Sequence, residues 1–547
     1  MALAWAAVIV AVPALWMLLF YRRSVMVRLD LASCSDEVNP ELPDDGGAAA
    51  RKPTSPPAGV LIASLEHVVQ SEGISVVAGG LGKAMKMYFA YAQRSDRTIK
   101  FVFPMVGDQE YAAFSPAESI VEGSVEVNVL HPGERIEFIA LDHPLFRERD
   151  RQTIYPDSRR PHQFLTFYSL WNRCIAELLL RYRERGEVGI YHCMDYHGGL
   201  APLYIEQLGV PTVPTAVTLH NALHQGALLS MLSGGEWQLL AKTLGLPAAR
   251  ESCNLEGDFN MLHGLVQYVQ RRQCGAGITA VSHCYATHLA ASEPILRGVG
   301  VGSHPNPMPD VEKPLLPGGV PALLEHKAAC KAAVQAELNL HIDPSAPLFA
   351  FVGRWTYEKG IDLLADALLW LVAAHPTAQA IVVGPIGDEA GQYSAARLGM
   401  AAASPGISRR LFVRTEFFLM SSQMRFAIDF CLCPSRMEPF GYTDIEFAWH
   451  GALCVANLAG GLGKVPGVYY TIAEAGDRAL HLAQLKRAFL RALGLPAATV
   501  RAGALAAVAA RFPFDAWSAA LDAQYDSVAP YMADVNGGGG GGGGSGD

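Results

Sequence analysis

The chain alternates short, buried strand patterns with amphipathic helical patterns along most of its length, and it does so in two blocks. Each apolar run ends in a turn rich in glycine or polar residues before the next helix begins. A stretch dense in proline and glycine, residues 299–321, separates the blocks. This alternation predicts an α/β fold with two doubly wound, Rossmann-like domains that face one cleft.

The length of 547 residues is also more than one ordinary domain needs, so two large domains are expected. A Pro-, Gly- and Asp-rich linker precedes the first block, and a final amphipathic helix is expected to pack back after the second. A glycine-rich, flexible tail closes the chain. The predicted segments are an N-terminal membrane anchor (residues 1–23), a linker (24–59), an N-terminal domain (60–310), a C-terminal domain (311–512), the returning helix (513–533) and the tail (534–547).

The first twenty residues, Met1–Phe20, carry no charged side chain and are long enough to span a bilayer as a helix. Arg22, Arg23 and Arg28 follow directly. Because positive residues stay on the cytosolic side, we expect a single-pass membrane protein with its catalytic part in the cytosol. The alternative is that this segment is simply buried against the rest of the protein.

The charge balance argues against a nucleic-acid partner. The net charge is −9 and the pI is near 6, whereas nucleic-acid-binding domains normally present a basic face. The ten cysteines are scattered with no C-x-x-C pair, which is typical of reduced thiols in a cytosolic compartment.

The stretch Cys431–Leu462 holds the densest set of candidate binding residues. A strand is expected over residues 426–435, then a turn with Pro439 and Gly441, then a helix over residues 444–453. Glu438 and Glu446 flank the start of that helix, whose free N–H groups suit a phosphate. The pattern indicates a sugar-nucleotide site, although any strand-to-helix turn of an α/β protein can carry Pro, Gly and Glu.

Polar side chains follow three strands of the first block. Asp195 and His197 come after one strand, His220 and Asn221 after the next, and Ser282 after a third, where it is the expected helix N-cap. Since ligands bind at the carboxyl ends of strands in open α/β sheets, these residues predict one cleft edge. A histidine in such a turn is about as often a packing or capping residue.

Two further turns are candidates for phosphate contacts. Gly79 and Gly80 begin a glycine turn whose backbone amides are suited to a phosphate, although tight turns need glycine anyway. Arg354 and Lys359 lie on the turn after the first expected strand of the second block, close to a helix start, where two cations suit a diphosphate. The alternative is an exposed pair on a solvated loop.

Several runs together resemble the retaining GT-B glycosyltransferases of the glycogen and starch synthase type (family 5), and most of all the synthase domain of fungal cell-wall α-1,3-glucan synthases. The runs "YHCMDYHGGLAPLY", "FVGRWTYEKGIDLLADAL" and "PSRMEPFGYTDIEFAWHGAL" carry the resemblance, which extends from about Ser64 to Trp517. It implies a GT-B fold, with an acceptor-side N-terminal domain and a nucleotide-sugar-binding C-terminal domain.

The resemblance also implies roles. Arg354 and Lys359 would hold the donor diphosphate, Glu438 the donor glucose and Glu446 the ribose, and His197 would face the sugar. The family keeps the anomeric configuration and needs neither a metal nor a cofactor. The implied nucleotide-sugar contacts are Gly79, Gly80, Gly441, Tyr442, Thr443 and Glu446, and the implied acceptor or sugar contacts are Asp195, His220 and Asn221.

One departure from the family concerns a donor contact. The family has a Lys in a K-x-G-G-L pattern, where this chain has Val77, and Lys83 is a possible substitute. The amylase-like domain and many membrane spans of the fungal enzymes are not visible in this sequence.

The expected function is a hexosyltransferase, an α-glucan synthase that transfers glucose from UDP- or ADP-glucose to the non-reducing end of an α-glucan through α-1,3 linkages. The alternatives are an α-1,4 starch or glycogen synthase, and a non-catalytic glucan-binding homologue.

Overall fold

The computed structural model describes residues 58–211, 213–226, 242, 244–246, 253–255, 258–472 and 477–535. The expected membrane anchor, nearly all of the linker and nearly all of the glycine tail lie outside these residues. Two compact units are present. The N-terminal unit runs up to Lys313 and includes Glu438–Tyr442 and the chain from Arg511, and the C-terminal unit comprises Pro314–Met437 and Thr443–Ala510.

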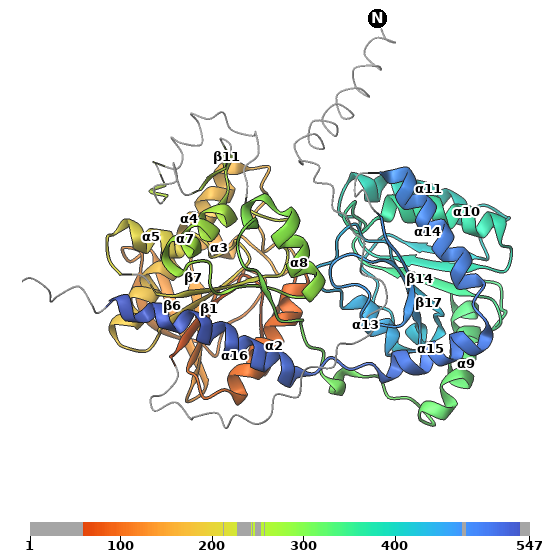
Figure 1. Ribbon diagram of the computed structural model, residues 1–547, viewed down its shortest axis with the longest axis horizontal. Helices are drawn as coiled ribbons and strands as arrows, with labels where there is room; N and C mark the ends of the chain where they lie inside the picture. Colours follow the sequence, from red (N-terminus) through yellow and green to blue (C-terminus); the bar gives the residue numbers. More distant parts are fainter. Residues whose placement is uncertain are drawn as a thin grey trace, which may run out of the picture. The chain divides into compact units, whose positions relative to one another are not determined.

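The N-terminal unit contains a nine-stranded sheet within the described residues (Figure 1). The seven strands from β13 to β7 are parallel, and β6 and β5 extend the sheet as antiparallel strands. In sheet order the strands are β13 (Gly302–Ser303), β12 (Ile278–Ala280), β9 (Thr215–Leu219), β8 (Ile190–Met194), β1 (Val60–Ala63), β4 (Ile99–Pro104), β7 (Ile136–Asp142), β6 (Val125–Gly133) and β5 (Ser115–Ile120).

Helices cover both faces of this sheet, as Figure 1 shows. On one face, α2 and the late helix α16 pack into one hydrophobic core with the strands, and the rings of Tyr88 and Trp517 lie 5.1 Å apart. The helices are α2 (Gly80–Arg94), α3 (Pro144–Arg147), α4 (Pro161–Glu184), α5 (Ala201–Gln207), α7 (Met261–Gln273), α8 (His283–Ser292) and α16 (Phe514–Val528). Two hairpins, β2 (His67–Val69) with β3 (Ile74–Val76) and β10 (Asn254–Leu255) with β11 (Asp258–Phe259), complete the unit.

The C-terminal unit has a six-stranded, wholly parallel sheet. Its strands, in sheet order, are β16 (Leu411–Arg414), β15 (Gln379–Val383), β14 (Leu348–Val352), β17 (Phe430–Cys433), β18 (Leu453–Asn457) and β19 (Gly467–Tyr470). The helices are α9 (Leu323–Glu337), α10 (Ile361–Ala374), α11 (Glu389–Ala402), α12 (Ser422–Ala427), α13 (Thr443–Ala448), α14 (Arg478–Leu493) and α15 (Ala497–Ala509). Both units are thus α/β, as the alternation predicts.

Two expected element boundaries are wrong in the C-terminal unit. The apolar run over residues 426–435 is divided, because its first two residues end α12 and only Phe430–Cys433 forms β17. The helix expected over residues 444–453 stops at Ala448. Gly451 adopts a left-handed φ of 75°, which turns the chain into β18 and ends the helical pattern early.

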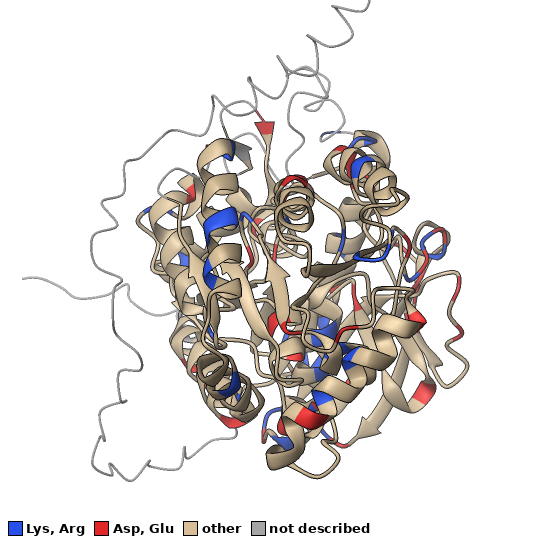
Figure 2. Ribbon diagram, turned by 90° about the vertical axis from the view of Figure 1, so that its right-hand side faces the viewer, with Lys and Arg blue, Asp and Glu red and all other residues tan. Residues whose placement is uncertain are grey.

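Charged residues of both signs lie interspersed over the described helices and loops in the view of Figure 2. Many form ion pairs, such as Arg147 with Asp142 at 2.8 Å. Within the described residues, no single helix has both the length and the apolar composition to cross a membrane; only α14 and α15 taken together, bent by 103°, meet those two criteria.

Buried histidines give the N-terminal unit a pH-dependent stability. His67 and His304 are fully buried, and burial lowers the pKa of each from 6.5 to about 4. Between pH 4 and 6.5 the unfolded chain therefore binds more protons than the folded chain, so stability falls as the pH falls through this window. At about 1.36 kcal/mol per pKa unit, the full shift of each histidine lowers the free energy of unfolding by on the order of 3 kcal/mol once the pH has fallen through this window. Asp195 acts in the opposite sense, because burial raises its pKa to about 7.

We expect urea denaturation to show a lower unfolding free energy at pH 4.5 than at pH 7. His67→Gln should flatten this pH dependence, because glutamine keeps polar groups near Leu65 O and the Tyr111 hydroxyl but does not titrate. His162→Gln, at an exposed position, serves as the matched control. An equal slope in the His67 and His162 variants would contradict the expectation.

Candidate active site

The turn between β14 and α10 carries Arg354 and Lys359. Arg354 is exposed and forms no ion pair with any described residue, while Lys359 is partly buried. Gly360 closes the turn with a left-handed φ of 70°, and a Cβ at this position would lie 2.2 Å from the carbonyl oxygen of Pro434. Only glycine therefore lets the β14–α10 turn approach the segment that follows β17. These two strands are neighbours in the sheet, so both turns leave from the same edge.

Arg436 fastens the two turns together. Its guanidinium donates to the carbonyl oxygen of Tyr357 at 2.5 Å and to both carboxylate oxygens of Asp362 at 2.8 and 2.9 Å. Its backbone N–H donates to the carbonyl oxygen of Glu358 at 2.8 Å, and its guanidinium stacks 3.6 Å from the Tyr357 ring. Only a planar guanidinium group, with its several N–H donors, can make these hydrogen bonds and stack on the ring at the same time. Arg436, which follows β17, thus fixes the turn of Arg354 and Lys359 in place.

Replacing Arg436 is expected to destabilise the C-terminal unit. The Arg436–Asp362 pair is nearly buried, so Arg436→Ala leaves a buried carboxylate that keeps only the longer contact to Arg478, 3.3 Å away. Loss of one partner of such a pair costs about 3–5 kcal/mol. Arg436→Lys keeps the charge but not the fork and should lose less. Urea denaturation measures both, and Arg414→Ala, at an exposed arginine, should stay within about 0.5 kcal/mol of the parent protein.

The segment between β17 and α13 holds the expected donor contacts Glu438, Gly441, Tyr442 and Thr443. Gly441 has a left-handed φ of 80°, and α13 begins at Thr443. The Glu446 carboxylate, expected beside a ribose, lies 3.3 Å from the guanidinium of Arg425.

Lys464, which was not among the predicted site residues, supports the first turn of α13. Lys464 donates to both carboxylate oxygens of Asp444, at 2.9 and 2.8 Å, and to the carbonyl oxygen of Gly461 at 3.0 Å. The carboxylate of Asp444 is fully buried. Lys464 therefore joins the glycine turn after β18 to the first turn of α13.

In the N-terminal unit, the ends of β8 and β9 come together through Asp195. Asp195 directly follows β8 with a φ of 51°, and its Oδ1 accepts the backbone N–H groups of His220 at 2.7 Å and Asn221 at 2.9 Å. The structure thus brings these three expected acceptor residues together. Because the carboxylate of Asp195 accepts both of these hydrogen bonds, its structural role is to hold the turn that follows β9.

His197 lies buried in a cluster of tyrosines. Its ring stacks on Tyr155 at 5.0 Å, and its Nδ1 has no hydrogen-bond partner among the described residues. Burial lowers the pKa of His197 to about 3, so its imidazole is neutral near pH 7. His220 is similar: its Nε2 is buried without a partner, and burial lowers its pKa to about 3. Neutral imidazoles with unsatisfied nitrogens suit hydrogen bonds to uncharged hydroxyl groups.

The glycine turn at Gly79 differs from the expected phosphate cradle. The Oε2 atom of Glu66 accepts the backbone N–H groups of Ala78 and Gly79 at 3.0 Å each and of Gly82 at 2.9 Å. Glu66 is 1% exposed, and its Oε1 accepts the Tyr155 hydroxyl at 2.5 Å. A protein carboxylate therefore occupies the anion position at the N-terminus of α2. The Gly79 amide, which was expected to face a ligand phosphate, donates in this structure to Glu66.

Glu66 and Arg436, which hold these turns, were not predicted from the sequence. Glu66 follows strand β1 by three residues, so the rule that identified Asp195 and His197 also applies to it. Arg436 had no comparable signal, because its partners are backbone carbonyls and an aspartate at the start of a helix far away in the sequence.

Val77, in place of the family lysine, is 36% exposed. Within the described residues, no group of three or more His, Cys, Asp or Glu side chains could hold a metal ion.

Comparison with known proteins shows what the chain is similar to. The starch synthase catalytic domain matches residues 61–301. The cell wall alpha-1,3-glucan synthase mok11 of Schizosaccharomyces pombe is 34% identical over 506 residues, which is 90% of this chain and 20% of that protein. The chain is thus similar in sequence to the glycogen and starch synthase family of glycosyltransferases. Glycogen synthase of Bordetella petrii is 29% identical over 308 residues, covering 53% of this chain and 54% of the enzyme.

A solved structure shows the fold of this chain. The catalytic domain of starch synthase IV from Arabidopsis thaliana, bound to ADP and acarbose, covers 87% of this chain and all of its own, with a TM-score of 0.63 and 19% identity. The predicted GT-B fold is thereby confirmed. The chain spans about one fifth of the length of the fungal relatives it matches, 20% in each case.

Proposed function

We propose that this chain is an α-glucan synthase of the glycogen and starch synthase family that transfers glucose from UDP- or ADP-glucose to the non-reducing end of an α-glucan, forming α-1,3 linkages. The observation that carries the proposal is the pair of cations, Arg354 and Lys359, on a turn that Arg436 holds in place. The fungal α-1,3-glucan synthases, 32–34% identical to this chain, favour the linkage.

The proposed reaction retains the anomeric configuration. The bond between glucose C1 and the donor phosphate oxygen breaks, and the nucleoside diphosphate leaves with the electron pair. An acceptor hydroxyl oxygen forms the new bond to C1 from the same face, and its proton passes to the departing phosphate. Arg354 and Lys359 would stabilise the charge that develops on the diphosphate, because preorganised cations act most strongly where charge appears in the transition state. Glu438 would hold the donor glucose, and neutral His197 would bind a glucose hydroxyl.

Linkage analysis of the product tests this proposal. The full-length chain is incubated with UDP-glucose or ADP-glucose and an α-glucan acceptor, without added metal, and the product is methylated and hydrolysed. We expect 3-linked glucose from one of the two donors. A product with only 4-linked glucose would instead support the α-1,4 synthase, and absence of transfer with both donors would contradict the enzyme proposal.

A non-catalytic glucan-binding role is the second candidate, and two observations favour it. Val77 presents an apolar, partly exposed side chain where the family has a donor-binding lysine. Glu66 occupies amides of the adjacent glycine turn. Under this alternative the protein binds α-glucan in a pull-down assay, yet releases no nucleoside diphosphate from either donor.

The proposed location is a membrane, with residues 1–23 as a single span and the catalytic part in the cytosol. The uncharged run followed by Arg22, Arg23 and Arg28 supports it. A fluorescent fusion that lacks residues 1–23 should move from the membrane pellet to the supernatant. A truncated fusion that stays in the pellet would contradict this location.

A further inference from the structure

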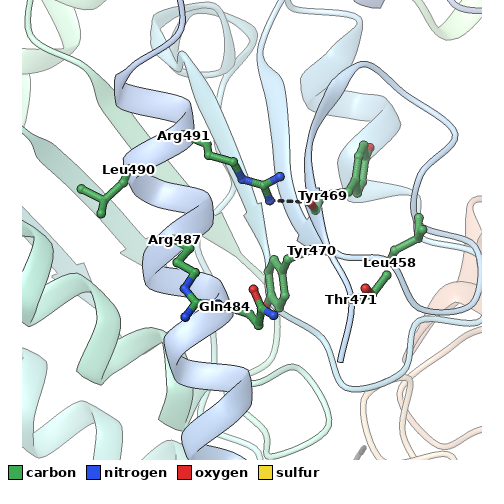
Figure 3. A pocket seen from close by; sticks show the side chains of 8 residues that line it. All are labelled: Leu458, Tyr469, Tyr470, Thr471, Gln484, Arg487, Leu490 and Arg491. Atoms are coloured by element: carbon green, nitrogen blue, oxygen red, sulfur yellow. Dashed lines mark hydrogen bonds between the residues drawn. The ribbon is translucent and has the colours of Figure 1, made fainter. Parts of the chain in front are cut away.

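A pocket of about 600 Å³ opens on the C-terminal unit, between the edge strand β19 and helix α14 (Figure 3). One wall is α14, and the other comes from the residues at the ends of β18 and β19. The volume is that of a small metabolite site rather than of a packing defect. None of the expected donor or acceptor residues lines it.

The pocket concentrates positive charge. Arg487 and Arg491 are four residues apart on α14, so their guanidinium groups project from the same face of the helix. Arg491 is held in place by a 2.6 Å hydrogen bond to the carbonyl oxygen of Tyr469, drawn in Figure 3. Arg487 is exposed and makes no ion pair with any described residue. Among the described residues that line the pocket none is acidic, although the whole chain carries a net charge of −9.

The remaining walls combine hydrogen-bonding groups with apolar surface. Thr471 supplies a hydroxyl and Gln484 an amide, and neither has a hydrogen-bond partner among the described residues. The Tyr470 ring is fixed by the hydrogen bond between its hydroxyl and His481 Nε2, at 2.9 Å. Leu458 adds an exposed aliphatic side chain. Such walls suit a compact ligand with hydroxyl groups and C–H faces as well as an anionic group.

This pocket is separate from the turn of Arg354 and Lys359. Arg354 and Lys359 follow β14, whereas the pocket follows β19, and the sheet order β14-β17-β18-β19 places two strands between them. Neighbouring strands are about 4.8 Å apart, so the two strand ends are separated by about 14 Å. A ligand of the size of a sugar phosphate in the pocket therefore does not touch the donor-binding turn.

We infer that this pocket binds a small phosphorylated organic molecule of about the size of a hexose phosphate. The phosphate lies between the forks of Arg487 and Arg491, which match phosphate oxygens in charge and geometry. The polyhydroxylated part lies against Tyr470 and Leu458, with hydrogen bonds to Thr471 and Gln484. This inference goes beyond the proposed transferase reaction, because the ligand is neither its donor nor its acceptor.

Calorimetric titration of the full-length protein with glucose 1-phosphate tests the inference. Because a hexose phosphate also resembles part of the donor, the titration is run on the parent protein, on Lys359→Ala and on Arg487→Gln. We expect Lys359→Ala to keep a binding event that Arg487→Gln weakens at least tenfold, as loss of a charge-assisted phosphate contact does. Inorganic phosphate should bind at least tenfold more weakly than glucose 1-phosphate, and glucose should not bind detectably at this site.

Arg501→Gln is the matched control, since Arg501 is an exposed arginine on the neighbouring helix α15. It should titrate like the parent protein, and its melting temperature and that of Arg487→Gln should both be unchanged. The inference fails if Arg487→Gln and Arg501→Gln bind glucose 1-phosphate equally well, or if Lys359→Ala abolishes all binding. Because the readout is binding and not glucose transfer, its failure leaves the proposed function untouched.

Discussion

Lys359→Ala is expected to lower the turnover number for glucose transfer by a factor of about 10²–10³, with a smaller effect on the KM for the donor. The physical reason is that the cation of Lys359 would meet the charge that grows on the leaving diphosphate, which is greater in the transition state than in the bound donor. Removal of one preorganised electrostatic contact of this kind costs about 2.7–4 kcal/mol of transition-state stabilisation. Release of nucleoside diphosphate under saturating donor measures the effect.

The control for this prediction is Lys86→Ala, which removes an exposed lysine of helix α2. It should leave turnover within about a factor of two of the parent enzyme, because surface substitutions away from a site rarely matter. Glu438→Ala should also lose most of the turnover, since it removes the proposed contact to the donor glucose. Unchanged turnover in both Lys359→Ala and Glu438→Ala would remove the proposed active site altogether.

The fold was predictable because its signals are local and repeated. Each buried strand of the C-terminal sheet is a short apolar run that ends in a turn, and all six strands are parallel, so hydrophobic period and chain order carry most of the information. The antiparallel extension at β5 was not predicted. Its six residues, "SPAESI", are mostly exposed and lack the apolar alternation that reveals a strand.

The candidate site was predictable only at strand ends. Asp195, His220 and Asn221 follow adjacent strands, and sheet topology brings them together. The contacts that hold the turns were not predictable, because they join backbone groups to side chains distant in sequence. Glu66 and the glycine turn are one example: the glycines alone indicate free amides, and only the structure shows the carboxylate that accepts them.

Glu66→Ala is expected to lower the free energy of unfolding by about 3–6 kcal/mol. The side chain is buried, and its removal leaves three backbone N–H groups and the Tyr155 hydroxyl without their acceptor. Each buried donor left unsatisfied costs about 1–3 kcal/mol, partly offset where water enters the space. Glu66→Gln keeps one carbonyl oxygen for the amides but loses the negative charge at the N-terminus of α2, so it should cost about 1–2 kcal/mol. Urea denaturation at pH 7 measures both variants.

Glu72→Gln provides the comparison, since Glu72 is exposed and lies only six residues further along the chain. Its unfolding free energy should differ from that of the parent protein by less than about 0.5 kcal/mol. A Glu66→Ala protein as stable as Glu72→Gln would mean that the amides of the glycine turn do not depend on Glu66. The turn would then be open to a phosphate, as the glycines suggest in isolation. A large loss of stability would instead show that the turn depends on Glu66 as the acceptor of its amides.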